Sequence, residues 1–212
     1  MSKPLKKPVP SPKFRRRAEA RPDEILDAAL AVFTDRGFDA ARVDDIAAAA
    51  RLSKGAVYLY FDSKEALLKG LIEREVAPVA QRLRALADAG GDDPAATLRL
   101  VVTAVTQLLN APQMFATPKL VLSVAPRFQE IAEFYRKRVL DEAIGAIAAL
   151  HRKGVAAGVF RDAESDTVAR MVMGPIFIYA MRKHVLGAKD KSSPETRSAA
   201  HLDILFEGLV KR

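Results

Sequence analysis

The segment VDDIAAAARLSKGAVYLYFDSK, residues 43–64, constrains the fold of this chain most, because it compresses two short helices and a polar turn into one unit. Its first half places apolar residues at the i, i+3, i+4 and i+7 spacing of a buried helical stripe: Val43, Ile46, Ala47 and Ala50. Ser53 can accept a backbone N–H and cap a second helix, which we expect from Lys54 to about Tyr60. Two helices joined this closely are typical of a helix-turn-helix that reads DNA.

The second helix is expected to have two distinct faces. Val57 and Phe61, four residues apart, are predicted to pack inward, and Leu52 is predicted to pin the turn. The outward face carries Lys54, Gly55, Ala56 and Tyr58. Because Gly and Ala are small, the backbone at the start of this helix can approach a DNA duplex closely.

Residues 25–68 resemble a known family through three strings taken together: ILDAALAVFTDRGF, VDDIAAAARLSKGAVYLYF and SKEALL. They are similar to the DNA-binding domain of the TetR/AcrR family of bacterial transcriptional regulators. The resemblance implies an all-α fold, with an N-terminal three-helix DNA-binding domain that contains the helix-turn-helix and a larger C-terminal helical domain for ligand binding and dimerisation. We assign a disordered basic arm to residues 1–21, the DNA-binding domain to 22–66 and the regulatory domain to 67–212.

By position, the resemblance implies that Lys54, Ala56 and Tyr58 face base edges or phosphates, and that Tyr60 and Lys64 hold the DNA backbone. A phenol hydroxyl and an ammonium group are both good donors to phosphate. The full set of predicted DNA-binding residues is Arg42, Ser53, Lys54, Gly55, Ala56, Tyr58, Tyr60 and Lys64.

Three places depart from the family pattern. Ala41 and Arg42 stand where a capping Thr or Ser is usual, so the first helix of the pair lacks that cap, although Arg42 can reach a phosphate. Arg51 replaces a glycine in a turn that needs a positive φ, which costs about 1 kcal/mol. Asp44 stands where many relatives carry a basic or polar base-contacting residue. Its carboxylate would either repel phosphates or accept a hydrogen bond from a cytosine amine.

The positive charge of the chain is concentrated at its beginning. Residues 1–22 contain eight basic residues and one acidic residue, so they carry +7 of the net charge of +8. With five prolines and few apolar residues, this segment is predicted to be an extended arm. It is expected to add salt-dependent affinity for phosphates or the minor groove. The alternative is a solvated leader without a specific contact.

The rest of the chain is predicted to be helical, without a strand pattern or a repeat. A first helix is expected to begin at Pro22 and to end at Gly37 in a left-handed cap. A long helix capped by Ser63 is expected to continue to about Ala89 with a kink at Pro78, which removes one hydrogen bond. Further helices are expected near residues 94–110, 118–124, 127–157, 165–186 and 194–210.

The last two of these helices are predicted to form a dimer interface. The first is apolar over nearly its whole circumference and the second carries an apolar stripe, so a monomer would cover both with difficulty. The resemblance implies a four-helix interface between two subunits, which would bring two reading helices to one palindromic operator. A wholly intramolecular core is the alternative.

The resemblance also implies a small-molecule site among the middle helices. The large flexible or aromatic residues that can line it are Met114, Phe115, Phe134, Tyr135, Met171, Phe177 and Met181. Taken one at a time, each fits plain core packing better than a ligand contact. His151 and His184 lie beside basic residues and are predicted to be solvated surface side chains. The shortage of acidic residues nearby favours a neutral or anionic effector over a cation.

Other functional classes are disfavoured by what the sequence lacks. Without cysteine there is no disulfide or thiolate metal site, and the three histidines show no metal-ligand spacing. No phosphate-cradling glycine loop and no Gly-x-Ser-x-Gly elbow occur, so we expect no catalysis, no metal site and no cofactor. No apolar run approaches the roughly 20 residues of a membrane helix, and no secretory signal is recognised. We therefore expect a cytoplasmic protein without a membrane partner.

The sequence thus predicts a sequence-specific transcriptional regulator, a repressor released from its operator by a small-molecule effector. The ligand would shift the kinked helix and change the separation of the two reading heads. The alternative is a nucleoid-type protein that coats DNA through the basic segment, without an operator or an inducer. Its affinity would ignore DNA sequence and would survive the loss of Tyr58.

Overall fold

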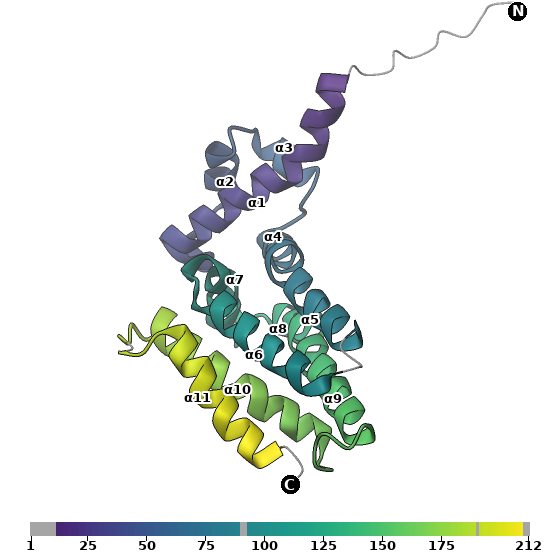
Figure 1. Ribbon diagram of the computed structural model, residues 1–212. Helices are drawn as coiled ribbons and strands as arrows, with labels where there is room; N and C mark the ends of the chain where they lie inside the picture. The colour runs from purple at the N-terminus through teal and green to yellow at the C-terminus, as the bar shows by residue number, and fades with distance from the viewer. Residues whose placement is uncertain (1–11, 90–92, 190, 210–212) are drawn as a thin grey trace, which may run out of the picture. The chain divides into compact units, whose positions relative to one another are not determined.

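The computed structural model describes residues 12–89, 93–189 and 191–209, and these residues form helices and turns without a β-strand (Figure 1). The predicted all-α fold is confirmed. The chain divides into two compact units, residues 1–67 and 68–212. No helix among the described residues is long and apolar enough to cross a membrane.

The first unit contains four helical elements, of which the last continues into the second unit: α1 (Pro12–Ala40), α2 (Val43–Ala49), α3 (Lys54–Tyr58) and the beginning of α4 (Lys64–Leu71). α1 packs on α2, and α2 packs on α3. Each of these helices contributes almost fully buried apolar residues: Ile25, Ala29, Phe33, Phe38, Ile46, Val57 and Leu67. This small core fixes the orientation of α3, the predicted reading helix, against α1 and α2.

α1 differs from the predicted first helix. Residues 12–21 are helical where the sequence predicted an extended arm, and Pro22 lies inside the helix rather than at its first turn. The Arg, Ala and Glu residues before Pro22 are good helix formers, and their preference outweighs the one hydrogen bond that proline cannot make. The predicted disorder of residues 1–11 lies outside the described residues. Gly37 has the predicted positive φ, 77°, and one more helical turn follows it.

The second unit contains the end of α4 and further helical elements: η1 (Ile72–Val76), α5 (Ala77–Ala89), α6 (Pro94–Asn110), α7 (Pro112–Val124), α8 (Gln129–Tyr135), η2 (Arg136–Leu140), α9 (Asp141–Ala156), α10 (Ser165–His184) and α11 (Pro194–Leu209). α9 packs on α5 and α10, and α6 packs on α10 and α11. Their shared core includes Leu83, Val102, Ile147, Leu150, Phe160, Val172 and Phe206.

A π-helical turn, η1, stands where the sequence predicted a kink at Pro78. The Ala77 N–H bonds to the Ile72 carbonyl five residues back. Because Pro78 has no N–H to close the next normal turn, the wider turn directly before it keeps the chain helical. A second π-helical turn, η2, was not predicted. Arg138 of η2 donates two hydrogen bonds, of 2.6 and 2.8 Å, to the Glu73 carboxylate of η1, so a bidentate ion pair joins the two irregular turns.

Two other helix boundaries differ from the predictions. α7 begins at Pro112 rather than at residue 118, because a proline at the first helical position needs no N–H partner, and Pro118 lies within the helix. The helix expected over residues 127–157 begins at Gln129 and contains η2.

Candidate nucleic-acid interface

The turn between α2 and α3 keeps a positive φ although Arg51, rather than a glycine, stands in it. Arg51 has a φ of 56°, in the left-handed region that costs a residue with a Cβ about 1 kcal/mol. The N–H of Leu52 bonds to the Ala47 carbonyl at 2.9 Å and closes the turn. Ala47 and Val57 are buried on either side of it, so core contacts hold α3 at a fixed angle to α2.

α2 and α3 each have a backbone hydrogen bond to a side chain at their first turn. Ser53 Oγ accepts a hydrogen bond from the Ala56 N–H at 3.2 Å, which confirms the predicted cap of α3. α2 has no Thr or Ser cap. Instead Asp45, three residues further along, accepts a hydrogen bond from the Arg42 N–H at 3.3 Å. Asp45 also pairs with Arg36 at 3.0 Å, so α2 is anchored to α1.

The outer surface of α3 and the residues directly after it carry large side chains that the fold does not bury. Tyr58 is 42% exposed, Tyr60 37% and Leu59 81%. The two tyrosines were predicted from the sequence as DNA contacts, and Leu59 was not. The sequence does contain a sign of this exposure. Leu59 is apolar but does not share the inward spacing of Val57 and Phe61. Phenol hydroxyls suit phosphate, and an exposed leucine suits a thymine methyl.

The start of α3 is open to the outside. Ser53, Lys54 and Gly55 are exposed and Ala56 is half-buried. A Cβ added at Gly55 would meet no atom within 4 Å, so nothing in the fold requires a glycine there. A glycine in a helix costs about 0.5–1 kcal/mol relative to alanine. A close approach of the DNA backbone to α3 would be a physical reason for glycine at position 55.

Lys54, the first residue of α3, reaches back to α2. Its Nζ lies 2.9 Å from Asp44 Oδ2, with the two side chains 52% and 60% exposed. The hydrogen bond and charge of Asp44 raise the pKa of Lys54. The predicted DNA contact therefore has a carboxylate partner within the protein.

Lys64 has partners that the sequence did not reveal. Its Nζ donates to the carbonyl oxygens of Phe38 at 2.8 Å and Asp39 at 3.1 Å, and it lies 4.9 Å from the centre of the Phe38 ring. These contacts tie the start of α4 to the end of α1. An ammonium group has three donors, so one N–H remains for the predicted phosphate contact. Arg42, which was also predicted to reach a phosphate, is exposed.

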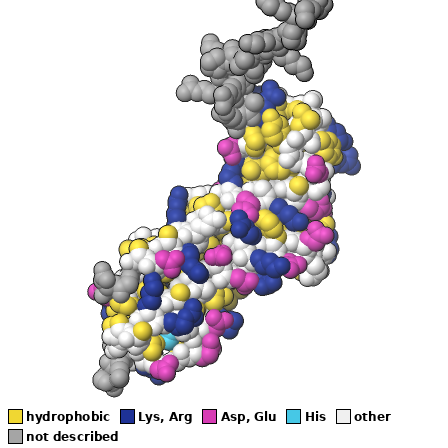
Figure 2. Space-filling model, turned by 90° about the vertical axis from the view of Figure 1, so that its right-hand side faces the viewer, with side chains coloured by type: hydrophobic (Ala, Val, Ile, Leu, Met, Phe, Trp, Pro, Cys, Tyr) yellow, Lys and Arg dark blue, Asp and Glu magenta, His cyan; other side chains and the backbone are white. Residues whose placement is uncertain are grey.

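Charge is mixed outside the first 22 residues. Those residues carry +7 of the net +8, which leaves +1 for the remainder. On the face drawn in Figure 2, basic and acidic side chains are interspersed over the described part of the chain. Such a face offers no broad positive field to a duplex.

In the second unit, the residues predicted to line an effector site are only partly brought together. The rings of Phe115 on α7 and Phe177 on α10 lie 5.8 Å apart, and the His184 ring stacks 5.3 Å from Phe115. Met114 and Met181 are half-buried on the same two helices. The three rings make one aromatic cluster between α7 and α10.

The other three predicted residues have different surroundings. Phe134 is half-buried with Lys69 Nζ 5.9 Å from its ring centre, and Tyr135 is buried, which raises the pKa of its phenol to about 12. Met171 is 64% exposed on α10, so the structure does not bring it to the Phe115 cluster. Thr117 was missed by the sequence analysis. Its side chain is 1% exposed, and its hydroxyl has no hydrogen-bond partner among the described residues.

Two family models match this architecture, each over one part of the chain. The model of bacterial regulatory proteins of the tetR family matches residues 25–71, and the C-terminal domain of AefR-like transcriptional repressors matches residues 96–203, half of the chain. The chain belongs to the tetR family of bacterial regulatory proteins.

Individual proteins with helix-turn-helix (HTH) names and a solved structure are also similar to this chain. The transcriptional repressor NicS of Pseudomonas putida is 27% identical over 175 residues, which are 81% of each chain. Two Bacillus subtilis regulators, YerO and YuxN, are both 28% identical, and the chain spans 42% and 38% of their length. A tetR-family structure from Mesorhizobium loti superposes with a TM-score of 0.78 at 18% identity, covering 92% of this chain and 99% of that one.

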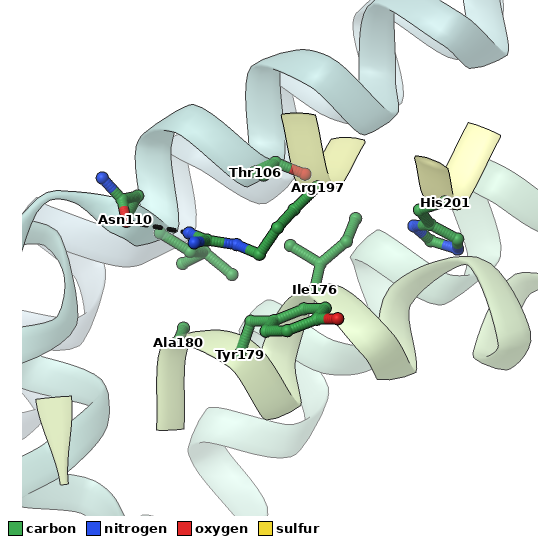
Figure 3. Close-up of a pocket in the computed structure, with 8 residues that line it drawn as sticks. Thr106, Asn110, Ile176, Tyr179, Ala180, Arg197 and His201 are labelled. Carbon is green, nitrogen blue, oxygen red and sulfur yellow. Dashed lines mark hydrogen bonds between the residues drawn. The ribbon is translucent and has the colours of Figure 1, made fainter. Parts of the chain in front are cut away.

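A cavity of about 20 Å³ lies between α6, α10 and α11 of this tetR-family protein (Figure 3). Arg197 donates to Asn110 Oδ1 at 3.3 Å and lies 5.3 Å from the Tyr179 ring, and Lys183 donates to the Asn110 carbonyl at 3.0 Å. A space of this size holds about one water molecule. Arg197 and Lys183 therefore cap the end of α6 at Asn110. The cavity beside them is too small for an effector.

A wider apolar groove of about 210 Å³ lies between α10 and α11. Met171, Pro175, Ile204 and Leu205 contribute to its lining. Ile204 is 73% exposed, and Ile178, further along α10, is 45% exposed. These two helices thus present apolar side chains that the single chain does not cover.

The prediction of solvated histidines is wrong for His151. Its side chain is 2% exposed, its Nδ1 lies 2.9 Å from Ser165 Oγ, and its ring stacks on Phe160. Burial lowers its pKa. His184 is half-buried, with Nε2 3.1 Å from the Leu109 carbonyl. An imidazole has an apolar body and a polar tip, so both rings can pack between helices. The basic residues next to them in the sequence were therefore a poor guide to their burial.

Proposed function

We propose that this tetR-family protein is a cytoplasmic homodimeric repressor that binds a palindromic DNA operator through α3 and leaves it when a small molecule binds the second unit. One observation carries the DNA-binding part. The fold buries Val57 of α3 but leaves Lys54, Gly55 and Tyr58 facing outward at a fixed angle. A rigid exposed helix of this kind suits a major groove.

The dimer is supported by the exposed apolar residues of α10 and α11. A single chain leaves Met171, Ile178 and Ile204 in water, whereas a second copy would bury them. A two-fold axis between the copies would present two α3 helices to the two halves of one operator.

The effector site is proposed at the cluster of the Phe115 and Phe177 rings, with the His184 imidazole as its polar group. Apolar pockets with a few polar groups are the usual form of small-molecule sites. A solved complex of the repressor SmeT from Stenotrophomonas maltophilia with triclosan, 23% identical with a TM-score of 0.75, is a related fold with a small molecule bound. It covers 91% of this chain and 92% of that one.

Release is proposed to act through η1. α4 belongs to both units and continues directly into η1, whose Glu73 is held by Arg138 of η2. A π-helical turn can return to α-helical geometry by a small shift in hydrogen bonding. A ligand that favours one of the two geometries would therefore shift the equilibrium between a binding and a released state.

The test is selection of binding sites by the purified full chain from a random duplex pool at near-physiological salt, beside a Tyr58→Ala variant. We expect an inverted repeat that the variant no longer enriches. Salt-sensitive binding without a motif would instead support the nucleoid-type function, for which the +7 charge of residues 1–22 is the specific argument. Equal operator affinity with and without every small molecule that binds the protein would contradict the release mechanism.

A further inference from the structure

The ion pair between Asp44 and Lys54 is unusual for a surface meant to bind DNA. Lys54 begins α3, and Tyr58 lies one helical turn further along the same face. Asp44 lies in the first turn of α2, and its Oδ2 holds the Lys54 ammonium at 2.9 Å. An acidic side chain thus lies beside the predicted reading surface.

Each member of this pair alone would also interact with the DNA backbone, which carries no sequence information. A free lysine beside a duplex is attracted to any phosphate, and a free carboxylate is repelled by all of them. Joined, the two carry no net charge, so they contribute little to non-specific attraction. What they still offer is a donor next to an acceptor, with both groups about half exposed.

The major-groove edge of a G·C base pair offers the complementary arrangement. Guanine presents the acceptors O6 and N7, and the cytosine amine is a donor. O6 and the amine are hydrogen bonded to each other, at a separation of about 2.9 Å. Asp44 and Lys54 therefore match the spacing and polarity of that edge without separating from one another.

Resting on the DNA-reading role proposed above, we propose that Asp44 and Lys54 act as one unit that selects a G·C base pair in each half of the operator. Lys54 donates to guanine O6 or N7, and Asp44 accepts from the cytosine amine. An A·T pair also presents an acceptor beside an amine, thymine O4 and adenine N6. The unit prefers G·C because guanine O6 and N7 are two adjacent acceptors for the ammonium, whereas thymine O4 lies between a methyl group and the adenine amine.

The experiment uses the inverted repeat selected by the wild-type full chain. Each G·C pair in the repeat is changed to A·T, symmetrically in both halves, and dissociation constants are measured by fluorescence anisotropy. At one position we expect wild-type affinity to fall about 5- to 150-fold for each half-site that is changed. Lys54→Ala and Asp44→Ala should each abolish most of that preference, and the double variant should lose no more than either single variant.

Asp44→Ala should also bind a scrambled duplex more tightly, because the released Lys54 gains a phosphate. Its salt dependence should be steeper by about 0.9 for each half-site. Asp45→Asn is the matched control, since it removes the same charge from the next residue and keeps an acceptor for the Arg42 N–H. It is expected to leave the G·C preference unchanged.

The outcomes separate this inference from the proposed function. A repeat in which no G·C position depends on both side chains would overturn the inference and leave the regulator intact. The inference is also overturned if the two single losses multiply in the double variant, because the residues would then act independently. If the wild type selects no repeat at all, the proposed function fails first.

Discussion

Replacing Gly55 with alanine should separate what the fold requires from what DNA requires. Gly55 is the second residue of α3, and a Cβ there meets no atom within 4 Å. Its φ is not in the positive range, so alanine fits without strain. Because alanine restricts the unfolded chain more than glycine, the variant should be more stable by about 0.4–1 kcal/mol.

DNA binding by the same variant should become weaker. If α3 approaches the duplex at Gly55, the added methyl group overlaps atoms of the DNA, and overpacking of this kind costs about 1–3 kcal/mol. Operator affinity should then fall about 5- to 150-fold for each half-site that a subunit occupies. Urea denaturation followed by circular dichroism measures the first effect, and anisotropy with the selected operator measures the second.

Gly145→Ala is the control for this experiment. Gly145 lies in α9 of the second unit, and a Cβ there comes no closer than 3.4 Å, to the flexible end of Arg84. The control should gain similar stability without losing operator affinity. If Gly55→Ala is stabilised and binds its operator as tightly as the wild type, α3 does not approach DNA at this residue, and the reasoning is refuted.

Four further predictions follow from particular contacts. Lys64→Ala should weaken binding to every DNA sequence, because it removes a phosphate contact. The slope of log affinity against log salt concentration should become shallower by about 0.9 per half-site. If a salt titration finds the slope unchanged, Lys64 makes only its bonds to α1. Gly154→Ala should destabilise the chain by about 1–3 kcal/mol, since its Cβ would lie 2.1 Å from the Phe160 ring, and urea denaturation measures this. Ile204→Glu, at a side chain 73% exposed, should yield monomers in sedimentation velocity without loss of helicity; a dimer that persists would move the interface elsewhere. Burial lowers the pKa of His151 in the folded state, so the unfolded chain binds the proton more readily. The free energy of unfolding should therefore fall as pH drops through about 6.5. His151→Gln should flatten this pH dependence in thermal unfolding.

The local features of the reading unit could be predicted from the sequence. Ser53 caps α3, Val57 is buried and Gly37 adopts a positive φ, as expected, and Arg51 adopts the positive φ that its turn needs. These features depend on residues within about four positions of each other, and caps and helical spacing act over that range. The helical content of the second unit followed for the same reason.

Other outcomes depended on contacts between residues far apart in the chain. Lys64 bonds to carbonyls 25 and 26 residues away, and Glu73 pairs with Arg138 across 65 residues. His151 is buried and Met171 exposed, because the neighbouring helices cover one and not the other. The sequence determined that the chain is helical and where caps and turns form in the reading unit, since those preferences are local. Only the tertiary structure decided which side chains meet, since that depends on how the helices pack.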